Sequence, residues 1–260
     1  MAIDFDAIKR KLERLSGANK NRSSTWKPTE GEEHTVRLIS FPDNDGQPFK
    51  EIQWYYNIPG ARGMVAPYQF GKKDPVQELI TKLREEGSKE SYEMAKNLYP
   101  NMRTYAAVIV RGQEDEGVKI WGFGKTVYQK LLSIMLDEDY GDITDPLSGR
   151  DIKVVCTKPP GKKYAMTDVM PRGKATKLST NAKQSTEWLE NIPSVEDLYT
   201  LKSYDEITTV LESWINGDEA SVASEGTEHP TSSPSETSSE KTDSTGNYNS
   251  LDDAFADLMD

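Results

Sequence analysis

Apolar residues recur along this chain at two different periods. Between residues 26 and 170, short stretches rich in β-branched and aromatic residues are separated by turn signals such as Glu116-Gly117 and Ser148-Gly149. This alternation with turns predicts β-strands. The expected strands cover residues 35–41, 49–58, 105–111, 118–123, 151–157 and 163–170.

Other stretches repeat apolar residues every three or four positions, which predicts helices. The main ones lie at about 75–97, 126–136 and 185–216. Pairs of residues three apart suggest capped helix starts. These pairs are Asp74 with Gln77, Thr126 with Gln129, Ser194 with Asp197, and Ser203 with Glu206.

Strands interrupted by helices favour an α+β fold. Five or six short strands with a helix between them suit a small OB-fold-type β-barrel, although a β-sandwich remains an alternative because strand order cannot be read from the pattern. We expect this core to span residues 26–217, with an inserted helical subdomain at 57–98 and C-terminal helices at 185–217.

The two ends of the chain differ from this core. Residues 1–25 form a basic arm in which Phe5, Ile8, Leu12 and Leu15 recur at helical spacing. Its other face carries Lys9, Arg10, Lys11 and Arg14. A helix this short is marginal alone in water, so we expect it to order against a partner.

Residues 218–260 form an acidic tail. Eleven acidic residues and Lys241 give the tail a net charge of −10, which leaves −1 for the other 217 residues. Its Ser/Thr/Glu/Gly-rich composition predicts disorder. The last ten residues nevertheless place apolar side chains on one face of a short helix, amid aspartates, which suits docking on a partner. The residues concerned are Leu251, Asp252, Asp253, Phe255, Asp257 and Leu258.

The sequence offers few residues for a catalytic site or a metal site. The only histidines are His34 and His229, and Cys156 is the only cysteine. Gly122-Phe-Gly-Lys-Thr126 lacks the upstream glycine of a phosphate-binding loop. No leader segment or membrane span is expected either. We therefore expect a soluble, cytosolic protein that is not an enzyme.

Aromatic residues interleaved with Lys and Arg are the abundant pattern. A non-specific binder of single-stranded DNA needs stacking platforms beside positive charge. The candidates on or next to the expected strands are Trp54, Tyr55, Tyr56, Arg103, Tyr105, Arg111, Lys119, Trp121, Phe123 and Lys125. Lys162-Lys163-Tyr164 and the cations Arg172, Lys174 and Lys177 follow. Because alternate residues of a strand share a face, Lys119, Trp121 and Phe123 should lie together.

The order of these features resembles the single-stranded-DNA-binding (helix-destabilising) proteins of T4-like bacteriophages. The resemblance is carried by residues 8–11 (Ile-Lys-Arg-Lys) with 15–20, by 36–38 ahead of Phe41-Pro42, by 103–110, by 119–125, and by the acidic end of the tail. It implies an OB-fold core that binds single strands cooperatively, in the cytoplasm of an infected bacterial host.

The resemblance also implies roles for particular residues. By matched position it places Arg37, Tyr99, Arg103, Tyr105, Trp121 and Tyr164 on the DNA. Lys9, Arg10 and Lys11 would contact a neighbouring protomer, and the tail would engage phage replication and recombination enzymes.

One departure from the family concerns zinc. Members of the T4 type hold zinc with one His and three Cys in the inserted subdomain, but residues 57–97 contain neither residue type. A tetrahedral zinc site therefore cannot form there, and we expect no cofactor. Helix packing should hold the subdomain instead, through Val76, Leu79, Ile80, Leu83, Met94 and Leu98.

Two other functions remain open at this point. The body could be a protein-interaction scaffold with the tail as docking peptide, or an OB-fold protein that binds RNA. Salt-sensitive binding of oligo-dT, and its comparison with a matched RNA, would discriminate among them.

Overall fold

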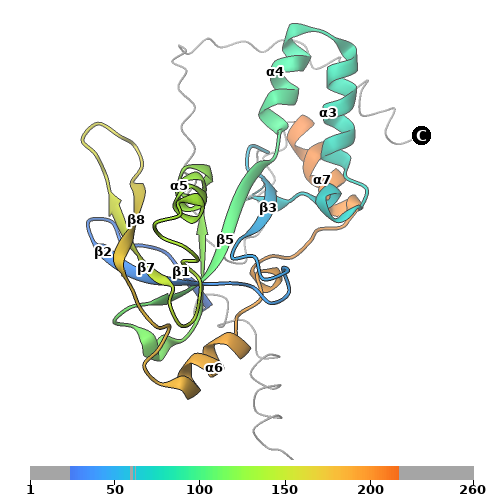
Figure 1. Cartoon of the computed structure of the whole chain (residues 1–260). Helices are drawn as coiled ribbons and strands as arrows, with labels where there is room; N and C mark the ends of the chain where they lie inside the picture. The colour runs from blue at the N-terminus through green and yellow to red at the C-terminus, as the bar shows by residue number, and fades with distance from the viewer. Residues whose placement is uncertain (1–23, 59–60, 62, 217–260) are drawn as a thin grey trace, which may run out of the picture. The chain divides into compact units, whose positions relative to one another are not determined.

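The computed structural model describes residues 24–58, 61 and 63–216 of the chain (Figure 1). Within them the fold is α+β, as the sequence pattern predicts, and it has an eight-stranded mixed sheet and five α-helices. The strands are β1 (Thr25–Trp26), β2 (Glu33–Ile39), β3 (Lys50–Tyr55), β4 (Met64–Val65), β5 (Asn101–Val110), β6 (Lys119–Phe123), β7 (Arg150–Thr157) and β8 (Met166–Ala175). The helices are α3 (Pro75–Glu86), α4 (Lys89–Leu98), α5 (Lys125–Leu136), α6 (Ala182–Glu190) and α7 (Tyr204–Ile215), with 3₁₀ turns η1 (Pro67–Phe70), η2 (Glu114–Glu116) and η3 (Glu196–Leu198).

The sheet is open. Its path runs β1-β6-β5-β2-β7-β8, and β3 pairs off this path with β4 and β5. The β1–β6 pair is parallel, whereas β2–β5, β2–β7, β5–β6, β7–β8 and β3–β4 are antiparallel. Because β1 and β8 end the path without pairing to each other, the sheet does not close into the expected barrel.

The chain divides into two compact units. Of the described residues, unit 1 comprises those up to Glu51 together with Arg103–Tyr199, and unit 2 comprises those from Ile52 to Met102 and from Thr200 onward. The inserted subdomain expected at 57–98 lies within unit 2. The structure groups α7 with that insertion, although the sequence pattern had assigned it to the C-terminal part of the core.

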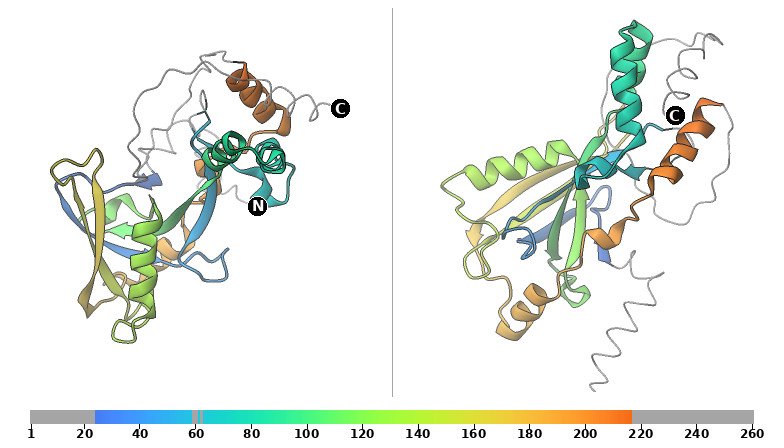
Figure 2. Two further views of the ribbon diagram at one scale, coloured as in Figure 1. Left: turned by 90° about the horizontal axis from the view of Figure 1, so that it is seen from above. Right: turned by 90° about the vertical axis from the view of Figure 1, so that its right-hand side faces the viewer.

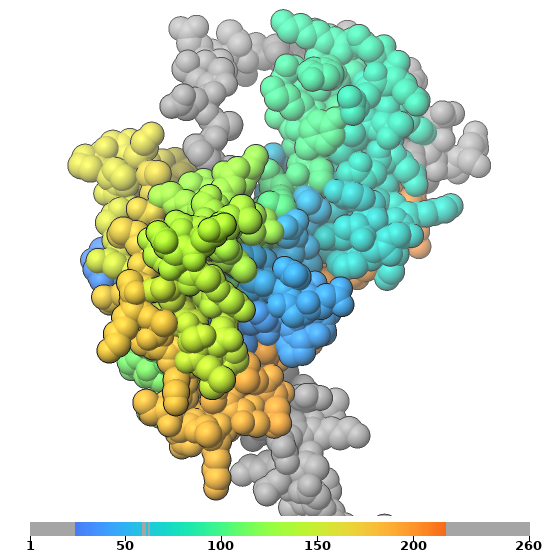
Figure 3. Space-filling view, viewed as in Figure 1, coloured from blue at the N-terminus to red at the C-terminus, as the bar shows by residue number. Residues whose placement is uncertain are grey.

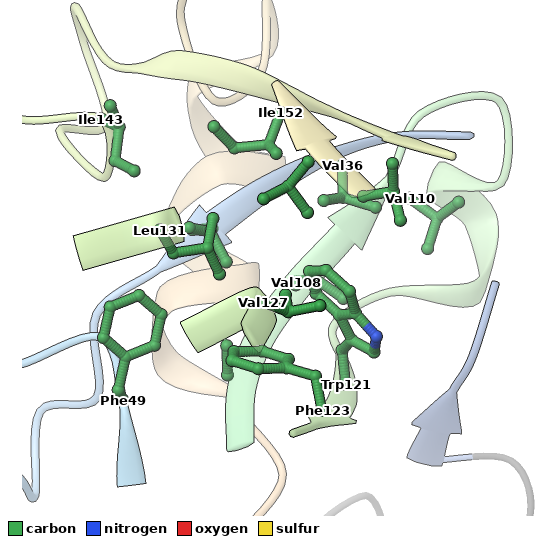
Figure 4. Close-up of a cluster of buried hydrophobic side chains, with 14 residues drawn as sticks. Val36, Phe49, Val108, Val110, Trp121, Phe123, Val127, Leu131, Ile143 and Ile152 are labelled. Carbon is green, nitrogen blue, oxygen red and sulfur yellow. The ribbon is translucent and has the colours of Figure 1, made fainter. Parts of the chain in front are cut away.

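The core of unit 1 lies between one face of its strands and helix α5. Alternate residues of β2, β5, β6 and β7 point to it; Ile152 and Val154 do so from β7. Helix α5 contributes Val127 and Leu131, and Figure 4 shows these two with Ile152. Trp121 and Phe123 lie in the same cluster, with ring centroids 4.6 Å apart. The period of two along the strands therefore builds this core.

The core of unit 2 is formed by α3, α4 and α7. Helices α3 and α4 lie side by side, seen end-on in the left panel of Figure 2. The apolar residues of α3 and α4 that the sequence pattern singled out lie in this cluster, Met94 at its edge. Ile207, Leu211 and Ile215 join them from α7.

Several local expectations need correction. The helix expected over 75–97 is two helices, because Gly87 takes a left-handed φ of 73° and Ser88 starts α4. Asp74 caps α3, but the side chain of Gln77 donates to Tyr55 Oη instead of turning back to the cap. Helix α5 begins one residue before Thr126 and has Gly124 as its N-cap.

The two expected C-terminal capping boxes have different outcomes. Ser203 and Glu206 form the box at the start of α7, as predicted. At Ser194 only the 3₁₀ turn η3 forms, with Val195 as its N-cap. The basic arm with Lys9, Arg10, Lys11 and Arg14 and the tail residues Leu251, Asp252, Asp253, Phe255, Asp257 and Leu258 lie outside the described residues.

Candidate nucleic-acid interface

Positive charge is concentrated in one hairpin of unit 1. This basic hairpin, residues 150–177, consists of β7, the connection 158–165, β8 and the two residues that follow. It contains eight Lys and Arg residues and two acids, Asp151 and Asp168, so its net charge is +6. Because the chain outside the tail has a net charge of only −1, the hairpin is a local positive feature of an otherwise acidic or neutral body.

An aromatic ring lies among cations at the tip of the hairpin. Lys158, Lys162 and Lys163 are exposed, and Tyr164 is 43% exposed. The Nζ of Lys163 lies 5.3 Å from the centroid of the Tyr164 ring. Figure 3 shows this tip, yellow at the upper left, beside the green spheres of α5. The tip therefore offers a stacking surface and phosphate-binding charge together.

The outward face of β8 continues this surface. Met166, Met170, Arg172 and Lys174 alternate along the strand and are exposed, whereas Val169 points into the core. Asp168, on the exposed face, forms an ion pair with Lys130 of α5, and the hydrogen bond from Lys130 lowers the pKa of Asp168. The charge of this acid is therefore offset locally.

A buried arginine holds the base of the hairpin. Arg37 of β2 donates from Nε to Asp151 Oδ1 at 2.8 Å. Its Nη1 donates to the carbonyl of Asp145 at 3.3 Å, just before β7, and its Nη2 to that of Thr176 at 2.7 Å, just after β8. Burial lowers the pKa of Arg37, and the ion pair with Asp151 opposes this effect. Arg37 therefore ties together both ends of the hairpin.

A second arginine shares the same carboxylate. Arg111 donates from Nη2 to Asp151 Oδ1 at 2.9 Å and from Nε to Oδ2 at 3.2 Å. Its Nη1 donates to the carbonyl of Leu178 at 2.8 Å. Arg37 is fully buried in this network, which corrects the expectation that it binds DNA directly; Arg111 is partly exposed and takes part in the same network.

Most of the expected stacking residues of β3, β5 and β6 are in the interior. Tyr55, Tyr105, Lys119, Trp121 and Phe123 are all buried. Lys119, Trp121 and Phe123 do share a face, as strand parity predicts, but this face packs into the core and Lys119 pairs with Glu116 at 3.1 Å. Stacking requires an exposed ring face, so these five residues are not part of the candidate surface.

Buried contacts explain the positions of Tyr55 and Tyr105. The hydroxyl of Tyr55 donates to Asp74 Oδ2 at 2.8 Å and supports the start of α3. The ring of Tyr105 lies against Gly122, where an added Cβ would be 2.9 Å from Tyr105 Cε1. Arg103 lies over the same glycine and donates from Nη2 to the Gly122 carbonyl at 3.0 Å. Gly122 leaves the space that both side chains fill.

The remaining candidates retain exposed surface. Tyr99 and Lys125 are exposed, Arg103 is half-buried, and Tyr56 is half-buried with its ring stacked on Trp54 at a centroid distance of 6.0 Å. Tyr56 and Tyr99 belong to unit 2, whereas Arg103, Lys125 and Tyr164 belong to unit 1. Among these candidates, Tyr164 combines an exposed ring with a lysine, Lys163, over its ring.

In the described ranges, no three side chains of His, Cys, Asp or Glu are placed to hold a metal ion. None of the helices from α3 to α7 is long and apolar enough to cross a membrane.

A comparison of the chain with protein-family models and with curated protein sequences finds no match. The candidate interface therefore rests on the charge, exposure and geometry of the basic hairpin.

Proposed function

We propose that this protein binds single-stranded DNA without sequence preference and coats it during phage DNA replication, recombination and repair. The observation that carries the proposal is the tip of the basic hairpin, where exposed Tyr164 lies among Lys158, Lys162 and Lys163. Every base has a π-face and every nucleotide a phosphate, so a ring beside cations binds single strands of any sequence.

The energetics of such a surface are those of stacking and counterion release. Each base stacked on an aromatic ring contributes about 1–3 kcal/mol. Cations that neutralise phosphates release bound counterions, so affinity should fall steeply as salt rises. In duplex DNA the bases already stack on one another and cannot reach Tyr164, which favours single strands and traps melted DNA.

The connectivity of unit 1 supports an OB-type assignment for this core. Strands β2, β5 and β6 form an antiparallel series, α5 follows β6, and β7 and β8 form a hairpin on the other side of β2. OB-folds bind oligonucleotides through the face of their second and third strands and through loops that include the one between the fourth and fifth. In this order that loop is residues 158–165, the tip of the basic hairpin.

We extend the proposal to the two ends of the chain on the sequence alone. The arm residues Lys9, Arg10 and Lys11 would contact a neighbouring protomer and make binding cooperative. The tail, with its net charge of −10, would compete with phosphate for basic surface and, once displaced, recruit replication and recombination enzymes. Deleting residues 218–260 should then strengthen DNA binding at low salt, and unchanged affinity would refute this competition.

The test is a fluorescence anisotropy titration of the full chain with labelled oligo-dT at a low and a moderate salt concentration. Matched oligo-rU and a duplex of the same length serve as competitors. Tight, salt-sensitive binding in which dT outcompetes both would support the proposal. Preference for rU would favour an RNA-binding protein. No binding at low salt, with or without the tail, would refute the proposal and favour the scaffold.

A further inference from the structure

A second group of exposed aromatic and basic side chains lies in unit 2. We call it the aromatic turn, and it comprises η1 (Pro67–Phe70) with the three residues that follow. Tyr68 is 40% exposed and Phe70 is 44% exposed, and Lys72 and Lys73 are exposed beside them. Residues 63–73 contain no acid. The first acid after the two lysines is Asp74, which is buried, so the exposed charge of this segment is positive.

The residue between the two rings fixes the turn to the body of unit 2. Gln69 Nε2 donates to the carbonyl of Ala66 at 2.8 Å and to that of Gln53 at 3.1 Å. Its Oε1 accepts a hydrogen bond from the backbone N–H of Gln53 at 3.0 Å. Because Gln69 turns towards β3, its two neighbours are left to present their rings to solvent.

The end of the turn is fixed as well. Gly71 adopts a left-handed φ of 70°, which favours glycine, and its N–H donates to the carbonyl of Tyr68 at 2.9 Å. The buried carboxylate of Asp74 accepts from the N–H of Tyr68 at 3.3 Å and also caps α3 through Val76 N at 3.0 Å. The rings are therefore presented on an ordered backbone, so less conformational entropy is lost when a ligand binds.

We propose that the aromatic turn is a second contact site for single-stranded DNA, separate from the basic hairpin. This inference rests on the proposed function. Bases would stack on Tyr68 and Phe70, while Lys72 and Lys73 would neutralise adjacent phosphates. A strand that reaches both sites gains from the high effective concentration of the second site once the first is occupied.

Photocrosslinking of the full chain tests this directly. Oligo-dT substituted with iodouracil crosslinks to aromatic side chains that stack on the base, and trypsin digestion followed by mass spectrometry identifies the peptide. The aromatic turn lies in the tryptic peptide 63–72, and Tyr164 lies in the peptide 164–172. Crosslinks in both peptides are expected.

The outcomes separate this inference from the proposed function. Crosslinks in 164–172 without any in 63–72 would overturn the second site and leave the proposed function intact. The exposed rings would then be a candidate contact for a protein partner. An absence of crosslinks together with an absence of binding by anisotropy would refute both.

Substitutions provide an independent measurement. The double variant Y68A/F70A should lose roughly tenfold in affinity for a long oligo-dT, in keeping with the loss of a base stack. The variant Y68F/F70Y keeps both rings and should bind like the wild type. Y92A removes a more exposed ring from α4 of the same unit and is the matched control. Equal affinity of Y68A/F70A and Y92A would overturn the inference.

Discussion

Arg37 and Asp151 form an ion pair of 2.8 Å in which the Arg37 side chain has no exposed surface. The two residues are 114 positions apart and lie on the neighbouring strands β2 and β7. Arg111 shares the same carboxylate. The network is a support for the hairpin, and its energetic role can be measured separately from DNA binding.

Replacing Arg37 should destabilise the protein more than it affects DNA contacts. The variant R37M keeps the length and apolar stem but removes the Arg37 donor to the Thr176 carbonyl and the partner of Asp151, while the Asp145 carbonyl keeps its hydrogen bond from Gly149 N–H. Breaking a buried pair costs about 3–5 kcal/mol, which urea unfolding would detect. R84M, at an exposed arginine of α3, should change stability by less than about 0.5 kcal/mol. If R37M kept wild-type stability but lost oligo-dT binding, Arg37 would be a DNA contact after all.

A side chain at Gly149 should destabilise the fold. An added Cβ would lie 2.5 Å from the Asp145 carbonyl oxygen and 2.7 Å from both the Ile143 carbonyl oxygen and Arg37 Nη1. The turn before β7 would have to move, so G149A should lose about 1–3 kcal/mol of stability. At Gly173 of β8 an added Cβ meets nothing within 4 Å. A thermal melt of G149A equal to that of G173A would contradict the packing at this turn.

Because of Asp74, the free energy of unfolding should change with pH in the acidic range. Burial raises the pKa of Asp74 above its ordinary value of 3.8, against hydrogen bonds from Tyr55, Tyr68, Gln77 and Val76 that lower it. The folded state therefore holds this proton to higher pH than the unfolded state does. Stability should fall as pH rises from 3.8 through the folded pKa.

The variant D74N does not titrate at this position and isolates the effect. Urea unfolding of both proteins across a pH series should show the wild type losing stability relative to D74N as pH rises, with a constant difference at higher pH. A wild-type advantage that grows with pH would mean that the carboxylate is stabilised by its hydrogen bonds more than burial disfavours it.

The lysines at the hairpin tip should set part of the salt dependence of DNA binding. Each phosphate contact to a single strand contributes about −0.7 to the slope of log affinity against log salt. K162A/K163A should therefore flatten the slope by up to about 1.4, while K27A/K183A, at exposed lysines of unit 1 outside the hairpin, should leave it unchanged. Identical slopes for the two double variants in anisotropy titrations would place the phosphate contacts elsewhere.

Local rules predicted much of the fold. The six long strands overlap the stretches that alternation and turn signals predict, although β8 extends five residues further and β5 begins four residues earlier. The box of Ser203 and Glu206 forms because both members lie within one helical turn. Thr126 is not the N-cap of α5, because the helix starts at Lys125 and Thr126 is already its second residue. The break in the first helix came from Gly87, whose left-handed backbone ends α3.

The candidate site was harder to predict, because a period of two shows which residues share a face but not which face is covered. Trp121 and Phe123 lie together as expected, yet α5 covers their face. The sequence suggests that Arg37 contacts DNA, because its partner Asp151 is 114 positions away and cannot be recognised from the sequence. The hairpin cations were visible in the sequence, but their concentration around Tyr164 required the pairing of β7 with β8.

The composition of unit 2 from two chain segments limits how the protein can be shortened. Ile207, Leu211 and Ile215 of α7 complete a core whose other members lie between Tyr55 and Leu98. A stop codon placed before Tyr204 would therefore uncover the apolar surface of α3 and α4, although it would fall more than a hundred residues downstream of them. Deletions that remove the tail should begin after α7. Protease cleavage between η3 and α7 would cut the covalent link to a helix that completes the core of unit 2.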